Sequence, residues 1–199
     1  STTEMGTLTR THPASTLVRL GGLGLPSTTT ERPGLPPLES VSKVELKRYL
    51  GTWYEIASLP QRFQRGCSFT TATYTLRADG DIDVLNRCRK ATVGTSAGEE
   101  TSALGRARVV DKVTNAKLEV AFFRPFWGDY WIIDLADDYR YAVVGHPSRD
   151  YLWILSRSPT MDEDTYQRLL EGLQTRGYDT LRLVRTQQSS ANAPQVTKG

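Results

Sequence analysis

Alternating apolar and polar residues recur in short runs along the middle of the chain and predict β-strands. Between residues 71 and 76, Ala72, Tyr74 and Leu76 fall on one side of an extended chain and three threonines fall on the other, as in a strand with one buried face. Similar runs repeat at the spacing of an antiparallel all-β protein. They predict eight strands, near residues 52–59, 68–77, 81–89, 101–110, 116–123, 129–136, 140–146 and 150–157.

Short connections between these runs favour an up-and-down meander. The second and third strands meet across Asp79-Gly80, a pair that tolerates positive φ and suits a tight hairpin. The inward positions of the fourth strand are the small residues Ala103, Gly105 and Ala107. Small inward side chains leave room inside a sheet, so the pattern predicts a closed barrel around a cavity.

After the eighth strand the apolar spacing becomes helical and predicts a helix at about residues 161–176 that packs on the outside of the barrel. Thr160–Glu163 has the form of a capping box, and Gly177 is placed to end the helix. A last extended piece, residues 181–186, is predicted to join the sheet beside the first strand. The apolar stripe of the helix consists of Tyr166, Leu169, Leu170 and Leu173.

Composition then sets the boundaries and excludes some partners. The 199 residues are 38% apolar and 24% charged, which suits one domain, here at residues 41–188. Residues 1–40 are predicted to be a flexible arm rich in Pro, Gly and Thr, and residues 189–199 a disordered tail. The net charge of +3 comes from interspersed charges of both signs, so nucleic acid is not an expected partner. No targeting segment is visible, and no run reaches the roughly 20 apolar residues of a membrane-spanning helix.

Four segments in order resemble the lipocalins, in the branch of the bacterial outer-membrane lipocalin and apolipoprotein D. They are GTWYEIASLPQRFQRG (51–66), TATYTLRADG (71–80), YRYAVVG (139–145) and YLWILSR (151–157). The resemblance spans about residues 45–188 and implies an eight-stranded up-and-down antiparallel β-barrel, or calyx, with a C-terminal helix outside it. One departure is Ala136–Tyr139, where the family usually has Thr-Asp-Tyr.

The resemblance also assigns structural roles to Gly51, Trp53 and Arg157. The first and eighth strands are neighbours in such a barrel, so Trp53 at the start of one lies near Arg157 at the end of the other. A guanidinium over an indole contributes about 0.5–2 kcal/mol, and the pair is expected to close the barrel floor. A role for Arg157 as a ligand clamp is the less favoured alternative.

Side-chain parity and chain direction predict the ligand site. Loops at 60–67, 90–100, 124–128 and 145–150 fall at the open mouth, where aromatic and cationic residues suit the wet head of an amphiphile whose chain enters the barrel. The alternative is that these are ordinary solvated loop residues. The expected mouth residues are Arg62, Arg65, Phe126, Trp127, His146 and Arg149. The expected ligand-binding residues of the calyx are Ala72, Tyr74, Ile82, Val84, Asn86, Val120, Phe122, Tyr130, Tyr151 and Trp153.

The two cysteines, Cys67 and Cys88, allow two interpretations. An even count in a family that is usually exported supports a disulfide, although parity then requires a bulge near residue 68 or Cys67 still in the loop. The rival is a reduced Cys88 acting as a nucleophile in the calyx, as in the prostaglandin synthase type of lipocalin. With only His12 and His146 in the chain, no metal site is expected.

Together these features predict a carrier without catalytic activity or cofactor that binds, transports or stores a fatty acid, lysophospholipid or similar amphiphile. The resemblance implies the periplasm or outer membrane of a bacterial envelope. The remaining alternative is an interaction module in which the N-terminal arm or the rim docks on a membrane or partner.

Overall fold

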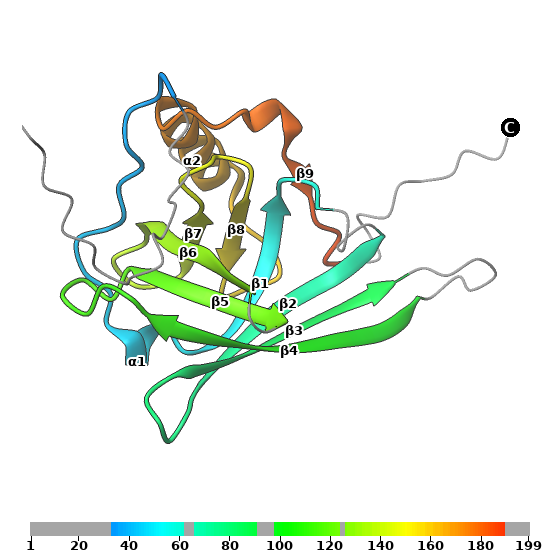
Figure 1. Cartoon of the computed structure of the whole chain (residues 1–199). Coiled ribbons are helices and arrows are strands. Elements are labelled where there is room, and N and C mark those ends of the chain that lie inside the picture. The colour runs from blue at the N-terminus through cyan, green and yellow to red at the C-terminus, as the bar shows by residue number, and fades with distance from the viewer. Residues whose placement is uncertain (1–32, 62–65, 91–97, 124–125, 190–199) are drawn as a thin grey trace, which may run out of the picture.

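A computed structural model describes residues 33–61, 66–90, 98–123 and 126–189 (Figure 1). Its helices are α1 (Leu46–Tyr49), α2 (Glu163–Thr175) and the 3-10 helix η2 (Thr180–Arg182). Its strands are β1 (Gly51–Ser58), β2 (Cys67–Leu76), β3 (Ile82–Lys90), β4 (Glu99–Val109), β5 (Lys117–Phe123), β6 (Phe126–Leu135), β7 (Tyr141–Gly145), β8 (Leu152–Ser156) and β9 (Val184–Arg185).

Strands β1 to β8 form a closed antiparallel barrel, which confirms the predicted fold. Each strand pairs with the next along the chain, and β1 pairs with both β2 and β8 to close the ring. The ninth strand, β9, pairs with β1 on its other side, with Ala57 opposite Arg185. The chain therefore encloses an interior whose wall consists of the alternate side chains of eight strands.

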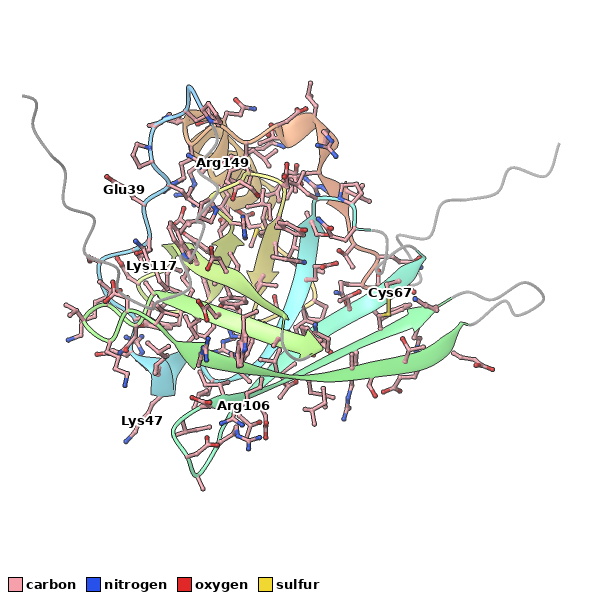
Figure 2. All side chains as sticks on the ribbon, viewed as in Figure 1. Glu39, Lys47, Cys67, Arg106, Lys117 and Arg149 are labelled. Carbon is pink, nitrogen blue, oxygen red and sulfur yellow. A yellow bond between two sulfur atoms is a disulfide. The ribbon has the colours of Figure 1, made fainter. Side chains whose placement is uncertain are left out.

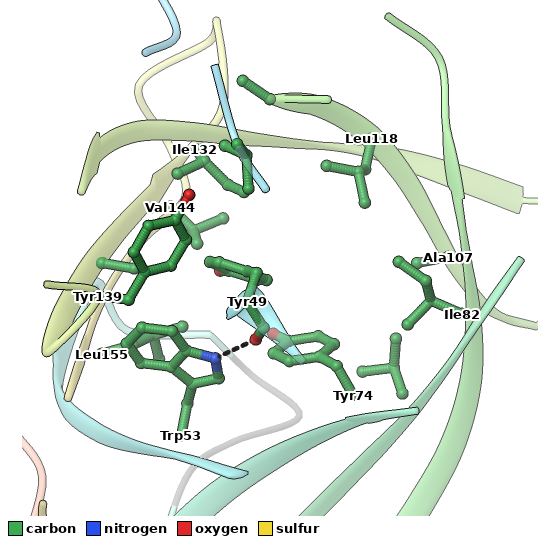
Figure 3. Packing of buried hydrophobic residues seen from close by; sticks show 14 residues of the cluster. Tyr49, Trp53, Tyr74, Ile82, Ala107, Leu118, Ile132, Tyr139, Val144 and Leu155 are labelled. Atoms are coloured by element: carbon green, nitrogen blue, oxygen red, sulfur yellow. Dashed lines mark hydrogen bonds between the residues drawn. The ribbon is translucent and has the colours of Figure 1, made fainter. Parts of the chain in front are cut away.

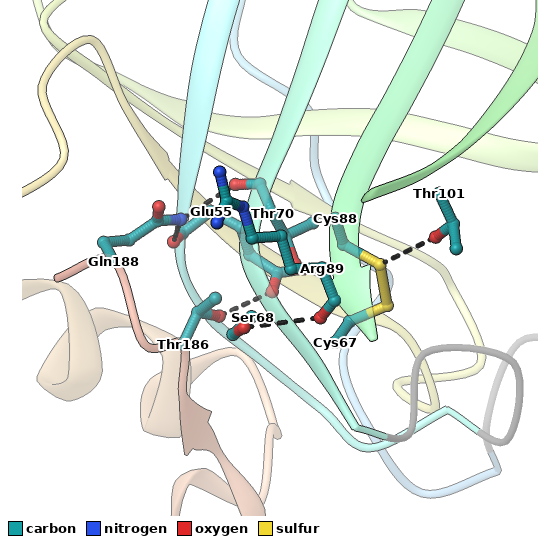
Figure 4. Close-up of a disulfide and its surroundings, with 9 residues drawn as sticks. All are labelled: Glu55, Cys67, Ser68, Thr70, Cys88, Arg89, Thr101, Thr186 and Gln188. Carbon is teal, nitrogen blue, oxygen red and sulfur yellow. Dashed lines mark hydrogen bonds between the residues drawn. A yellow bond between two sulfur atoms is a disulfide. The ribbon is translucent and has the colours of Figure 1, made fainter. Parts of the chain in front are cut away.

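The C-terminal segment 184–188 fills a gap between β1 and β2. These two strands pair only from Gly51 to Tyr54 of β1, and beyond that point they diverge. In the gap, the Thr186 N–H donates to the Ile56 carbonyl at 2.9 Å and the Phe69 N–H donates to the Gln187 carbonyl at 2.7 Å. We call this junction of β1, β2 and residues 184–188 the seam. Figure 4 shows two of its residues, Thr186 and Gln188.

Helix α2 lies against the outer wall of the barrel, as predicted (Figure 1). Tyr166, Leu169 and Leu173 pack in one apolar cluster with strand residues such as Ile154. The helix ends before Gly177, where the Gly177 and Tyr178 N–H groups donate back to the carbonyls of Gln174 and Leu173, both at 3.0 Å.

The capping box predicted at Thr160–Glu163 is wrong. Asp162 is the N-cap residue, and its carboxylate accepts the Thr165 N–H at 3.2 Å. Aspartate caps a helix as well as serine or threonine does. Glu163 is instead held by an ion pair with Arg185 of β9, in which Nη2 and Oε1 lie 2.7 Å apart.

Residues 33–45 run along the barrel before the first strand. The sequence assigns residues 33–40 to a flexible arm, whereas in the structure Leu38 is buried in the cluster beneath α2. Further along, the Val41 N–H donates to the Ile132 carbonyl at 2.9 Å, and the Val44 N–H donates to the Thr114 carbonyl at 2.7 Å. One buried leucine in a polar run hardly changes the composition, which is why the sequence predicts a flexible arm for residues that pack on the barrel in the structure.

Candidate ligand cavity

The closed end of the barrel is built around Trp53. Its side chain is completely buried, and its indole N–H donates to the carbonyl of Tyr49 in α1 at 2.8 Å. The Arg157 guanidinium lies over the indole at 3.7 Å from the ring centroid. Figure 3 shows Trp53 beside Tyr49 in the inner cluster. Short helix α1 and this pair together cover the floor.

Arg157 also ties α1 to β1 through the backbone. Its guanidinium donates to the carbonyls of Arg48, Leu50 and Thr52, at 2.7, 3.0 and 3.1 Å. Gly51 lies between these acceptors with φ at +101°, and a Cβ there would lie 3.4 Å from the guanidinium. Gly51, Trp53 and Arg157 therefore lie at the floor as the resemblance implies, and Arg157 is not among the residues that line the cavity.

Three tyrosine hydroxyls meet above the floor. The hydroxyl oxygen of Tyr130 lies 2.6 Å from that of Tyr49 and 2.7 Å from that of Tyr74. Burial raises the pKa of all three phenols, that of Tyr74 to about 12, so each stays protonated at neutral pH. Tyr49 is absent from the sequence prediction because it lies in α1, outside every predicted strand. Its position two residues before Gly51 was the available signal.

Above the tyrosines the barrel holds a cavity of about 330 Å³. Nine of the ten residues predicted for the calyx line it, together with His146. The tenth, Ile82, is buried in the inner cluster instead, because it begins β3 at the closed end, where side chains fill the barrel. The lining residues absent from the prediction are Glu55, Thr70, Thr71, Gly128, Asp129, Val144 and Leu155.

Small residues of β4 make room for one wall of this cavity. Gly105 and Ala107 are buried, as expected for inward positions, whereas Ala103 is exposed. A Cβ on Gly105 would lie 2.7 Å from the Phe122 ring and 2.9 Å from the Ala121 carbonyl. Glycine at this position therefore lets the Phe122 ring lie against β4 and form part of the lining.

His146 lies where β7 ends at the open side of the cavity. Its Nδ1 accepts the Ser148 N–H at 3.0 Å, and its Nε2 lies 3.9 Å from the Asp129 carboxylate. Burial lowers the pKa of His146, which Asp129 opposes, and burial raises the pKa of Asp129. The imidazole is therefore neutral at pH 7.

The other predicted mouth residues are placed differently. The prediction that Arg149 lies at the mouth is wrong. Arg149 is buried with φ at +66°, and its guanidinium donates to the carbonyls of Pro36, Pro147 and Arg176. It thus fastens the N-terminal segment to the end of α2 (Figure 2). Trp127 also does not line the cavity, and its ring packs 4.1 Å from the Arg108 guanidinium. Arg62, Arg65 and the side chain of Phe126 lie outside the described residues.

Glu55 is the buried carboxyl of the lining. It lies two residues beyond Trp53 on β1, so the parity that places Trp53 inward could have identified it. Its carboxylate accepts from the Thr186 hydroxyl of the seam. Burial raises the pKa of Glu55, an effect that hydrogen bonds from Thr186 and Ser58 partly offset. The group therefore keeps its proton to higher pH than an exposed glutamate.

Cys67 and Cys88 form a disulfide, with their Cα atoms 5.4 Å apart (Figure 4). The expected bulge is present: the β2–β3 register shifts between Ser68 and Thr71, and Phe69 has φ at +54°. The extra residue brings Cys67, at the first position of β2, onto the side of Cys88. The enzymatic alternative requires a free Cys88 thiol facing the cavity. Cys88 does not line the cavity, and the disulfide leaves it without a free thiol.

Within the described ranges, no cluster of three or more His, Cys, Asp or Glu side chains is arranged to hold a metal ion. None of the described helices has the length and apolar character needed to cross a membrane.

Comparison with known proteins gives consistent matches. The model of a family described as "Lipocalin-like domain" matches residues 44–188. Temperature-induced lipocalin-1 of Arabidopsis thaliana is 43% identical over 81% of this chain and 91% of its own length. The outer membrane lipoprotein Blc of Escherichia coli K12 is 43% identical over 74% of this chain and 81% of its own length. Mouse apolipoprotein D is 34% identical over 80% of this chain and 82% of its own length.

The solved structure of insecticyanin from Manduca sexta shares the fold, with a TM-score of 0.61 and 21% identity. The match covers 79% of this chain and 87% of the insecticyanin chain.

Proposed function

The chain belongs to the lipocalin family, and from this premise we propose that it binds a fatty acid or lysophospholipid in its cavity and transports or stores it. The family binds small hydrophobic ligands. The observation that carries the proposal here is the cavity of about 330 Å³, closed below by Trp53 and lined by apolar side chains such as Val84, Val120 and Phe122.

Burial of an acyl chain supplies the main favourable free energy for this function. Each buried methylene contributes about 0.8 kcal/mol, so ten of them give roughly 8 kcal/mol. Before the cost of ordering the ligand is subtracted, this corresponds to a dissociation constant of about 1 μM. The walls need no catalytic group for such binding, and we infer a carrier and not an enzyme.

We further propose a bacterial cell envelope as the setting, with export and peripheral association with a membrane. Two observations support this. The Blc relative is an outer membrane lipoprotein by its name. The Cys67–Cys88 bond is of a kind that persists in oxidising compartments such as the periplasm.

Displacement of a fluorescent probe tests the binding function. N-phenyl-1-naphthylamine, which is uncharged, is bound to the protein and then titrated with oleate or with oleoyl lysophosphatidylcholine. We expect both lipids to displace the probe at micromolar concentrations. Native mass spectrometry of protein purified from its source, with identification of any lipid that co-purifies, gives the physiological ligand.

A variant with a filled cavity provides the control. At Gly128 an added Cβ would meet its nearest atom, the Val120 carbonyl oxygen, at 3.8 Å, so Gly128→Leu places bulk in the cavity without backbone strain. We expect this variant to lose the probe and both lipids. Arg87→Leu, on the exposed outer side of β3, should bind as the wild type does. Equal binding by Gly128→Leu and the wild type would contradict the proposal, as would failure of both lipids to displace the probe.

A further inference from the structure

Resting on the proposed function, we propose that Glu55, Thr70 and Asn86 form a hydroxyl-binding subsite inside the cavity. Among the single-chain lipids of the proposed function, the subsite favours an uncharged head group that carries a hydroxyl, as in a monoacylglycerol or a long-chain alcohol, over the carboxylate of a fatty acid. The ligand hydroxyl accepts from Thr70 and donates to Glu55, while the acyl chain lies against the apolar wall. All three residues line the cavity.

Thr70 provides the first observation. Its residue is only 7% exposed, and its hydroxyl oxygen is buried without a hydrogen-bond partner. It is the sole such buried side-chain atom found in the part of the chain that the structure describes. Buried hydroxyls are almost always hydrogen-bonded, because leaving one unsatisfied loses the free energy of its hydration. Thr70 lines the cavity, so the cavity is where a ligand would supply the partner that this hydroxyl lacks.

The register of the strands brings the other two polar groups to the same wall. Ala72 of β2 is opposite Trp53 of β1 and opposite Asn86 of β3. Glu55 lies two residues beyond Trp53 toward the mouth, and Thr70 lies two residues from Ala72 in the same direction. All three polar residues therefore lie near Ala72, whose small side chain leaves space beside them. Figure 4 shows Glu55 and Thr70 near each other on β1 and β2, where Gln188 bonds to the carbonyls of both.

The seam holds two of these residues in place. The Gln188 side-chain amide donates to the backbone carbonyls of both Glu55 and Thr70, at 2.7 and 2.8 Å. The Thr186 hydroxyl donates to the Glu55 carboxylate. A carboxylate offers about four lone-pair positions, so the bonds from Thr186 and Ser58 leave acceptor capacity for a ligand hydroxyl. The pair is thus fixed before a ligand arrives.

The charges of the lining favour an uncharged head group at this position. Among the described residues that line the cavity, the acidic side chains are Glu55 and Asp129, none of the lining residues is Lys or Arg, and His146 is neutral at pH 7 because burial lowers its pKa. A carboxylate or phosphate placed beside Glu55 would meet a carboxyl group with no cation in the described lining to balance it. A hydroxyl group carries no such cost.

Three lipids with the same acyl chain test the subsite: monolauroylglycerol, methyl laurate and laurate. Each is titrated against bound N-phenyl-1-naphthylamine at pH 7. Wild-type protein should bind monolauroylglycerol about tenfold more tightly than methyl laurate, which lacks a hydroxyl donor; the factor corresponds to one or two net hydrogen bonds. Equal affinity for the two would overturn the subsite. Failure of all three lipids to displace the probe would instead contradict the proposed carrier function.

Variants of Thr70 locate the effect. Thr70→Val should weaken monolauroylglycerol binding about fivefold and leave methyl laurate within twofold, and it should raise the melting temperature of the ligand-free protein because the unsatisfied hydroxyl is gone. Thr70→Ser, which keeps the hydroxyl, should bind like the wild type. Thr75→Val, at an exposed position of the same strand, is the matched control. If Thr70→Val weakens both lipids equally, or lowers the melting temperature, the proposal is wrong.

Glu55→Gln tests the charge argument independently. This variant removes the ionisable carboxyl and keeps its shape. The affinity for laurate at pH 8, relative to monolauroylglycerol, should rise about threefold or more because a like charge no longer faces the ligand. An unchanged ratio would show that Glu55 does not face the head group. Circular dichroism of each variant establishes that the barrel is folded.

Discussion

Replacing Arg157 by leucine tests the closure of the barrel floor. The substitution removes one cation–π contact, at 3.7 Å from the Trp53 centroid, and three hydrogen bonds to carbonyls of α1 and β1. The cation–π contact contributes about 1 kcal/mol. Hydrogen bonds from a charged donor contribute about 1.5–3 kcal/mol each when buried, but Arg157 is half-exposed, so about 1 kcal/mol each is the appropriate value after solvent screening.

The free energy of unfolding should therefore fall by about 3–4 kcal/mol. For a domain of this size, 1 kcal/mol corresponds to roughly 2–4 °C in melting temperature, so Arg157→Leu should melt about 10 °C below the wild type. Urea unfolding followed by tryptophan fluorescence measures the change. Arg157→Lys, which keeps a charge over the indole but has no planar fork, should lose about half as much.

The matched control is Arg140→Leu. The Arg140 side chain is 62% exposed, and its Nε lies 4.0 Å from the Asp138 carboxylate. An exposed pair of this kind contributes little, so the control should lose less than about 0.5 kcal/mol. If Arg157→Leu and Arg140→Leu unfold at the same urea concentration, the floor does not depend on Arg157 and our interpretation of the contacts is refuted.

Three further predictions follow from the cavity and its rim. Burial raises the pKa of Glu55, so as pH rises the unfolded chain loses the Glu55 proton before the folded protein does. In thermal melts from pH 4 to 8, the wild type should therefore lose stability above about pH 4.5 relative to Glu55→Gln. Parallel curves of melting temperature against pH for the two proteins would contradict this. Gly105→Ala places a methyl group against the Phe122 ring and should weaken probe binding by moving that ring into the cavity; unchanged binding and melting would show that the ring has room. The double substitution Cys67→Ser and Cys88→Ser should cost about 3 kcal/mol in urea unfolding, given the loop of 21 residues, and a loss below about 1 kcal/mol would argue against a constraining role.

Side-chain parity predicted much of the cavity because a strand repeats every two residues. Alternation alone places Tyr74, Val84 and Val120 inward, and all three line the cavity. Parity gives the side of a strand but not the height along the barrel, which is why it assigns Ile82 to the cavity although Ile82 lies in the packed floor region. Glu55 shares the parity of Trp53, but the prediction of the cavity lining omits it because inward residues are expected to be apolar.

Loop residues were harder to place, because no periodicity fixes their direction. Arg149 was expected at the mouth, but its backbone has φ at +66° and its side chain turns toward Pro36 and Arg176 instead. The partners of Arg149 are 113 and 27 residues away in the chain. Contacts of this kind depend on the assembled fold and leave no local signature. The pairing of Gln188 with Glu55 and Thr70 belongs to the same class.

The seam has a consequence for folding. Gln188 donates to the carbonyls of Glu55 and Thr70, which lie 133 and 118 residues earlier in the chain. The Phe69 N–H donates to the carbonyl of Gln187 in the same segment. Nearly the whole domain must therefore be present before the edges of β1 and β2 acquire their last partners. Until then the folding barrel has an open side, and such long-range pairing forms slowly. The stage between synthesis and closure is when these strands depend most on protection from aggregation.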